Sequence, residues 1–208
     1  MTPKDPGSFT LNGDYYDGKE ITEPYLQELP EGHIIRTFVA EHRNILDFLR
    51  ELEKVREDIW QLTSPLDHPH LFLKLIHLAD QLVATEKHHI REEEILFPEL
   101  AKRGIQKYHF VLKSEHLFLR QYKKDFLDHV TDLSAMDFKS YKLQMNFMAI
   151  GIVGLLRGHI LRENRDVFPM ALEVVQDDEI WQTMRQASEK IGFYQLTSYE
   201  EFSARETA

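Results

Sequence analysis

One segment of the sequence occurs twice, and this duplication constrains the fold more than any other feature. Residues 88–98 read HHIREEEILFP and residues 159–169 read HILRENRDVFP. Aligned on their shared Phe-Pro ends, the two copies bring together the histidine that opens each segment and the glutamate four residues after it. Each copy follows a stretch that contains Glu-His, first Glu41-His42 and then Glu115-His116. The chain therefore reads as one hairpin followed by a second hairpin of the same design.

Long amphipathic helices are predicted for all four of these stretches. Apolar residues recur every three or four positions, as on one face of an α-helix, and no strand-like alternation of useful length interrupts them. Pro65 and Gly104 separate neighbouring helices, and Pro98 predicts a bend. The pattern favours an all-α fold, an antiparallel up-and-down four-helix bundle. We expect helices at residues 33–62, 69–101, 105–133 and 137–175, and a shorter one at 178–191.

The bundle accounts for only part of the chain. Residues 1–30 contain many Pro and Gly residues without a period, which predicts an irregular N-terminal extension. The bundle would span 31–175, and 176–208 would form a capping helix and a tail available to a protein partner. The chain begins with neither the basic residues nor the apolar stretch of a secretory signal, so we expect a cytoplasmic location.

Composition excludes several classes of function. The chain has no cysteine, so a metal would be held by nitrogen and oxygen ligands alone. Its 35 acidic and 25 basic residues give a net charge of −10, which argues against a nucleic-acid partner. We also expect no membrane span, because no apolar run reaches roughly 18 residues. Neither a glycine-rich phosphate loop nor the serine motif of hydrolases is present.

The repeated spacing of histidine and glutamate indicates a metal site. Residues four apart in a helix lie about 40° apart around the axis and about 6 Å along it. The pattern His-x-x-x-Glu therefore places an imidazole and a carboxylate on one face. Two such pairs, with one histidine from each of the other two helices, can surround two metal ions in a bundle core. Imidazole with carboxylate ligation suits iron.

Each of these residues taken alone has an ordinary structural explanation, but their combination favours a metal site. A single histidine on an apolar helix face is usually a hydrogen-bonded core residue. However, His42 lies within the apolar stripe of its helix, and His159 and Glu163 continue the stripe of theirs. Burying several unpaired polar groups costs free energy, and a shared metal site removes that cost.

The second helix leaves three ligand sets open. The Phe-Pro alignment favours His88 with Glu92. The apolar stripe instead favours His89 with Glu93, because the leucines of that helix lie within about 20° of His89. In a third arrangement, both histidines are ligands, and this arrangement is slightly preferred.

Together these motifs resemble those of the hemerythrin-like, or HHE cation-binding, domains over roughly residues 31–175. The resemblance implies a four-helix bundle with a di-iron centre, for which manganese or zinc would be competing metals. Helix three departs from hemerythrin itself, because Leu112 and Arg120 leave it one histidine; His89 would then supply the missing ligand. The resemblance implies that Glu92 and Glu163 bridge the irons and that the terminal ligands are His42, His88, His116 and His159.

The fourth helix also departs from hemerythrin, with His159 and Glu163 in place of a histidine and an aspartate five residues apart. Both departures resemble bacterial and regulatory members of the family, which disfavours simple oxygen storage. We expect binding or sensing of oxygen, nitric oxide or redox state by a protein that is not primarily an enzyme. The alternatives are iron donation or iron–sulfur repair, removal of peroxide or nitric oxide, and a metal-free helical interaction module.

The other glutamates and histidines of interest either support the metal ligands or lie outside the site. Glu41 and Glu115 are candidates to accept hydrogen bonds from ligand imidazoles, and His109 is a candidate for a supporting or gating role. We expect the other histidines outside the site: His33 at the start of the first helix, His68 and His70 solvated at the start of the second, and His77 and His129 on the surface.

Overall fold

The computed structural model describes residues 23–194 and 196–206, and within these ranges all regular structure is helical. The elements in chain order are η2 (Pro24–Gln27), α1 (Ile34–Gln61), α2 (Pro69–Ala84), α3 (Glu86–Arg91), η3 (Glu92–Leu96), α4 (Phe97–Lys102), α5 (Gln106–Thr131), α6 (Phe138–Arg162), η4 (Glu163–Val167), α7 (Phe168–Val174), α8 (Asp178–Ile191) and α9 (Tyr199–Glu206).

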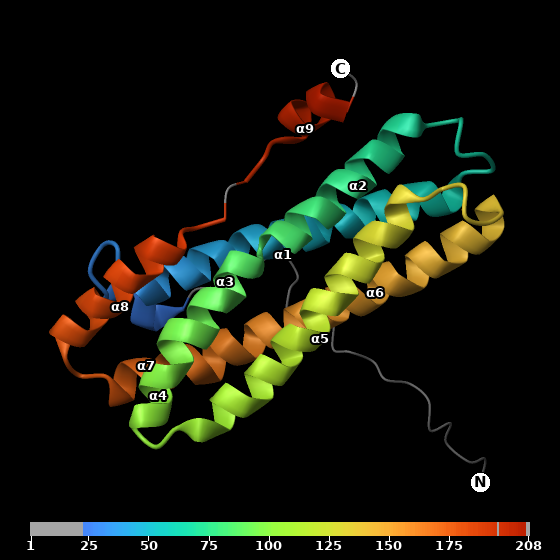
Figure 1. Cartoon of the computed structure of the whole chain (residues 1–208). Coiled ribbons are helices and arrows are strands. Elements are labelled where there is room, and N and C mark those ends of the chain that lie inside the picture. Colours follow the sequence, from blue (N-terminus) through green and yellow to red (C-terminus); the bar gives the residue numbers. More distant parts are fainter. Residues whose placement is uncertain (1–22, 195, 207–208) are drawn as a thin grey trace, which may run out of the picture.

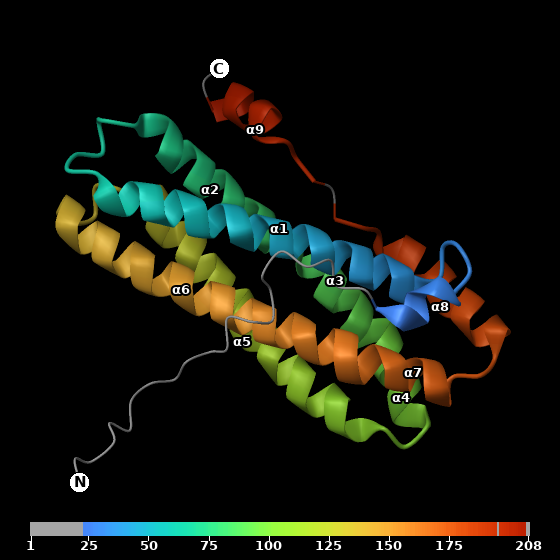
Figure 2. The ribbon, with the colours of Figure 1, turned by 180° about the vertical axis from the view of Figure 1, so that it is seen from behind.

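The long helices form a bundle in which each one packs against two neighbours (Figure 1). Helix α1 contacts α2 and α6, and α5 contacts the same two helices. Seen from behind, α1 and α6 run side by side (Figure 2). The predicted fifth helix, α8, packs against α1, α3 and η3, while the unpredicted α9 packs against α2. The all-helical class is confirmed. The irregular extension predicted for 1–30 lies mostly outside the described residues.

The second and fourth predicted helices are continuous only in part. Each changes to a π-helical turn, η3 and η4, directly before its Phe-Pro pair. Proline has no N–H to donate and its ring crowds the carbonyl four residues earlier, so a regular α-helix does not run unchanged into Pro98 or Pro169. Thr85 adds a further break between α2 and α3. A π-turn shifts the phase of the helix, and such turns are frequent at functional sites.

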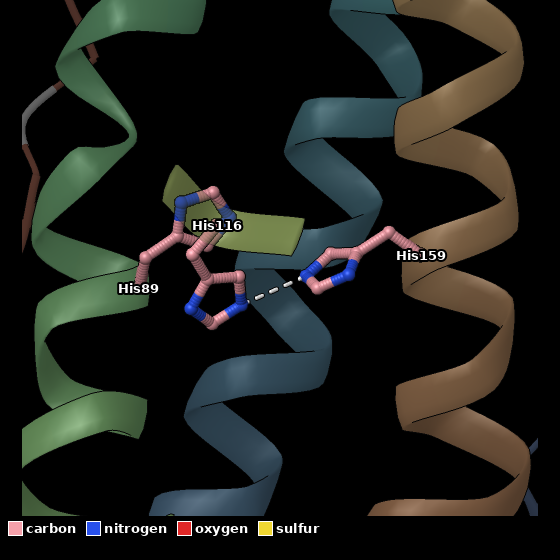
Figure 3. Close-up of side chains that lie close together, drawn as sticks. All are labelled: His89, His116 and His159. Atoms are coloured by element: carbon pink, nitrogen blue, oxygen red, sulfur yellow. Dashed lines mark hydrogen bonds between the residues drawn. The ribbon is translucent and has the colours of Figure 1, made fainter. Parts of the chain in front are cut away.

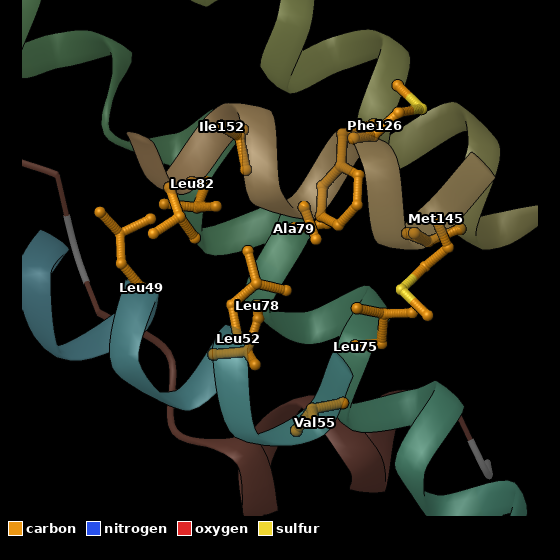
Figure 4. Packing of buried hydrophobic residues seen from close by; sticks show 14 of the residues in the cluster. Leu49, Leu52, Val55, Leu75, Leu78, Ala79, Leu82, Phe126, Met145 and Ile152 are labelled. Atoms are coloured by element: carbon orange, nitrogen blue, oxygen red, sulfur yellow. The ribbon is translucent and has the colours of Figure 1, made fainter. Parts of the chain in front are cut away.

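The apolar core is divided into two clusters. One fills the half of the bundle formed by α2 and the adjoining parts of α1, α5 and α6 (Figure 4). The other joins the start of α1 to α4, α7 and α8. Along α5, Leu112 belongs to the second cluster and Leu119 to the first, with His116 between them. The boundary between the clusters is thus a layer of polar residues inside the molecule.

One feature of the fourth long helix differs from expectation. The stretch Phe138–Val174 is long and apolar enough to cross a membrane by length and composition alone, although 44% of its most apolar segment is buried inside the bundle. A helix in the core of a bundle can have the same length and apolar composition. The apolar character is nevertheless not all internal, because Phe147 is 74% exposed and Ile150 54% exposed.

Candidate metal centre

Six side chains meet in the polar layer and form two overlapping groups. His42, His88, Glu92 and Glu163 each place a donor atom within 4.8 Å of the others. His116 and His159 form a second group of the same size with the same two glutamates. All six residues are buried. Glu92 and Glu163 occur in both groups and begin the two π-turns, so the duplicated motif brings its carboxylates to the centre of the cluster.

The imidazoles face one another through their Nε2 atoms. The Nε2 atoms of His42 and His88 are 2.9 Å apart, and those of His116 and His159 are 3.0 Å apart (Figure 3). All four Nδ1 atoms lie within hydrogen-bond distance of an oxygen acceptor. A neutral imidazole that donates through Nδ1 presents a lone pair at Nε2. With all four rings in this neutral form, four Nε2 lone pairs would be available to bind cations.

The two shared carboxylates lack ordinary partners. Glu92 and Glu163 are 0% exposed. Their oxygens lie 3.1 to 3.6 Å from imidazole nitrogens, yet none accepts a well-directed hydrogen bond. A buried carboxylate without partners is costly. Cations bound between these oxygens and the Nε2 atoms would satisfy both sets of ligands, so the residues present fit a bound metal.

Outer carboxylates orient the imidazoles in the same way in both repeats. Glu41 accepts a 2.8 Å hydrogen bond from Nδ1 of His88 and also binds Arg91. In the second repeat, Glu115 accepts a 3.0 Å hydrogen bond from Nδ1 of His159 and binds the equivalent arginine. The supporting role predicted for Glu41 and Glu115 is consistent with these contacts. A carboxylate behind an imidazole fixes its ring and increases its basicity.

The two halves of the cluster differ at one pair of equivalent positions. The Nδ1 atom of His42 faces the amide oxygen of Asn164 at 2.7 Å. The Nδ1 atom of His116 faces the carboxylate of Glu93 at 3.0 Å. Glu93 and Asn164 occupy the same position of the repeat. In the half that contains His116 and His159, both Nδ1 atoms therefore face a carboxylate. In the other half, only one Nδ1 atom does.

Protons occupy the cluster readily when no metal neutralises it. Burial lowers the pKa of His88, but Glu92 and the hydrogen bond to Glu41 outweigh burial and raise this pKa to about 10. Burial also lowers the pKa of His159, but Glu163 and Glu115 raise it to about 9. Protonated imidazoles thus balance the charge of the buried carboxylates at neutral pH. A metal ion that binds the imidazoles must displace these protons.

His89 joins the half of the cluster that contains His116 and His159 (Figure 3). Its ring stacks on that of His116 with centroids 4.1 Å apart, and its donor atom lies within 4.8 Å of those of both other histidines. Burial holds the pKa of His89 well below its usual range, so it is a neutral imidazole. The structure thus brings both His88 and His89 to the cluster, with Glu92 rather than the alternative Glu93.

The two arginines that lie three residues after His88 and His159 should contribute unequally to the stability of the fold. Arg91 is 0% exposed and binds Glu41 at 2.5 Å. Removing one partner of a buried pair costs about 3 kcal/mol, so Arg91→Ala should lower the melting temperature by about 6 to 12 °C. Arg162 and Glu115 are 39% and 32% exposed, and Arg162→Ala should cost at most about 1 kcal/mol. Thermal unfolding of the metal-free variants checks both values, and equal losses would contradict the burial argument.

The remaining histidines lie outside the cluster. His33 caps α1 and packs against Trp181. His109 lines a surface pocket beside Glu93, which leaves its gating role untested. His77 was wrongly placed on the surface: it is 4% exposed, because Tyr199 and Phe202 of α9 cover it. His129 is half-buried, while His68 and His70 are exposed.

Sequence reasoning missed three residues that support the cluster. Arg91 and Arg162 occupy equivalent positions in the two copies of the motif, and this repetition was a usable signal. Asn164 gave no such signal, because the other copy has glutamate at its position. Its role follows only from its distance to His42.

Comparison with known proteins agrees with this geometry. No curated protein matches the chain. The family model described as the hemerythrin HHE cation binding domain matches residues 33–171, which is more than half of the chain and includes all the clustered residues. With a buried histidine and glutamate cluster able to hold a metal cation, this chain belongs to the hemerythrin HHE cation-binding domain family.

Proposed function

We propose that this protein is a non-haem di-iron protein that binds or senses a small ligand such as oxygen or nitric oxide. The observation that carries the proposal is the pair of four-residue groups sharing Glu92 and Glu163. Two shared carboxylates would hold two cations, with two further imidazoles available to each. We also propose the antiparallel up-and-down topology, because α1, α2, α5 and α6 contact one another in a closed cycle.

Iron is the metal that this ligand set supports best. Nitrogen and carboxylate oxygen ligands with positions left open are typical of non-haem iron, and the chain has no thiolate that would favour zinc or a cluster. Manganese and zinc remain the competitors to be tested. When bound, iron supplies the redox change and the affinity for a diatomic ligand. The protein supplies the orientation of His88 and His159 through Glu41 and Glu115.

The unequal halves would give the two metal positions different ligand sets. His89 adds a third imidazole to the half containing His116 and His159. The half containing His42 and His88 has two, so the two metal positions would differ in their ligands. Such a difference between two neighbouring ions suits a binding or sensing role.

The proposal is tested by loading the metal-free protein with ferrous iron under anaerobic conditions. We expect two iron ions per chain and, after exposure to air or nitric oxide, new near-ultraviolet and visible absorption bands. Zinc loaded in parallel serves as a redox-silent control, and manganese serves as a slowly reacting one. Iron content far below two per chain, or spectra unchanged by both gases, would exclude the proposed function.

A further inference from the structure

A groove lies between α5 and α6 beside the candidate metal centre. Its volume is about 440 Å³. His159, whose ring belongs to the cluster, lines this groove. We call it the α5/α6 groove; its other principal lining residues are Glu115, Phe118, Leu119, Leu155 and Arg162, with Gly154 and Gly158.

The walls of the groove are suited to an uncharged molecule. Phe118, Leu119 and Leu155 provide apolar surface. The two charged residues neutralise each other, because Arg162 binds Glu115, and Glu115 also accepts the hydrogen bond from His159. A neighbouring pocket differs, since it is lined by Lys113, Arg120 and Glu93 and by no member of the six-residue cluster.

No close contact explains the glycine at position 158 of α6. Glycine is unfavourable in a helix interior, so each of the glycines in α6 calls for an explanation. A Cβ atom at Gly151 would lie 2.3 Å from the hydroxyl of Tyr122, which accounts for that glycine. A Cβ atom at Gly158 would meet nothing within 4 Å. Helical side chains lean toward the N-terminus of their helix, so a larger residue at 158 would extend over Gly154, which also lines the groove.

We propose that the α5/α6 groove is the route by which a small apolar molecule reaches the metal centre, and that Gly158 keeps this route open. The inference rests on the proposed function and names the side of the bundle from which the ligand arrives. The ligand class is a neutral diatomic gas, which the apolar walls admit and which carries no charge for the Glu115–Arg162 pair to repel.

The substitution Gly158→Phe should close the groove with little effect on the fold. Stopped-flow mixing of the ferrous protein with dissolved oxygen or nitric oxide is expected to show association at least about tenfold slower, equivalent to about 1.4 kcal/mol in the barrier. Iron content and helical circular dichroism should stay unchanged. Gly158→Ala, which adds one methyl group, should have a small effect, and Leu143→Phe adds bulk to an exposed position of α6 that does not line the groove.

A second measurement uses the metal-free protein and dissolved oxygen, whose paramagnetism broadens nearby NMR signals. We expect oxygen to broaden the methyl signals of Leu119 and Leu155, and Gly158→Phe to abolish this broadening. An association rate unchanged by Gly158→Phe overturns the proposal, as does a change of oligomeric state in light scattering, which would assign Gly158 to a contact between copies. If the iron-loaded protein binds neither gas, the proposed function fails. If the NMR broadening is also absent, the proposal that the α5/α6 groove is an entry route fails as well.

Discussion

Ferrous iron added anaerobically to the metal-free protein is expected to raise its melting temperature by about 8 to 16 °C. A ligand present at about 1,000 times its dissociation constant stabilises the folded state by about 4 kcal/mol. For a chain of about 200 residues, each kcal/mol corresponds to about 2 to 4 °C. The stabilisation arises because the ions neutralise Glu92 and Glu163, whose buried oxygens otherwise lack well-directed partners. Differential scanning calorimetry with and without iron measures the shift.

A pair of glutamates in one π-turn provides the matched control. Glu92 is buried at the centre of the cluster, whereas Glu94, two residues later in η3, is exposed. Glu92→Gln preserves size but removes the charge that two ions would share under the proposed function, and should abolish most of the iron-dependent shift. Glu94→Gln should retain the full shift. Equal shifts in both variants, or the same melting temperature with and without iron in the wild type, would show that Glu92 does not hold metal.

The helices were predictable because their signals are local and repeated. The three-and-four apolar spacing placed α1 and α5 within one to two residues of their observed ends, and the acidic residues at 177–179 correctly predicted the start of α8. Helix α9 was missed, because its short segment is stabilised by packing against α2 rather than by its own pattern. That same packing buries His77, so the error in this histidine follows from the missed helix.

The position of the site was predictable to the level of the motif. The duplicated His-x-x-x-Glu pairs brought His88, Glu92, His159 and Glu163 to one layer, as their alignment indicated. The competing phase argument for His89 with Glu93 assumed a regular helix from Leu71 to Leu96. The break at Thr85 and the π-turn that begins at Glu92 change the rotation per residue, so the stripe could not decide between the two registers.

The inequality of the two halves could not be predicted, because it depends on distances between helices. Glu93 and Asn164 are equivalent in the repeat, but sequence alone does not show which imidazole each one faces. Likewise, the different burial of Arg91 and Arg162 arises from what covers them: Phe38 and Phe193 pack on the guanidinium of Arg91. Packing between residues far apart in the sequence leaves no trace in the apolar periodicity of a single helix.

Metal affinity should increase steeply with pH, because His88 and His159 are protonated in the metal-free protein. Their pKa values are raised to about 10 and about 9, and a ligand imidazole must be deprotonated. Between pH 7 and pH 8.5 both side chains release a proton on binding. The apparent association constant should therefore rise about 100-fold per pH unit, tenfold for each proton.

The stability of the metal-free protein should change in the opposite direction. A histidine whose folded-state pKa is raised stabilises the fold fully below its unfolded pKa of about 6.5, and this contribution is lost as pH rises through the folded-state value. For His159 and His88, the loss extends from about pH 6.5 through about 9 and about 10. Raising the pH thus weakens the metal-free fold while it strengthens metal binding, so the stabilisation by metal should be far larger at pH 8.5 than at pH 6.5.

Isothermal titration calorimetry with cobalt(II), in buffers of different ionisation enthalpy, counts the protons released. We expect about two at pH 7.5, falling toward zero above pH 10 as both imidazoles lose their protons before binding. Glu41→Gln should reduce the count, because it removes a carboxylate that holds the proton on His88, whereas Glu94→Gln should leave it unchanged. A pH-independent affinity with no proton release would mean that His88 and His159 are neutral before binding, or that the cation binds elsewhere.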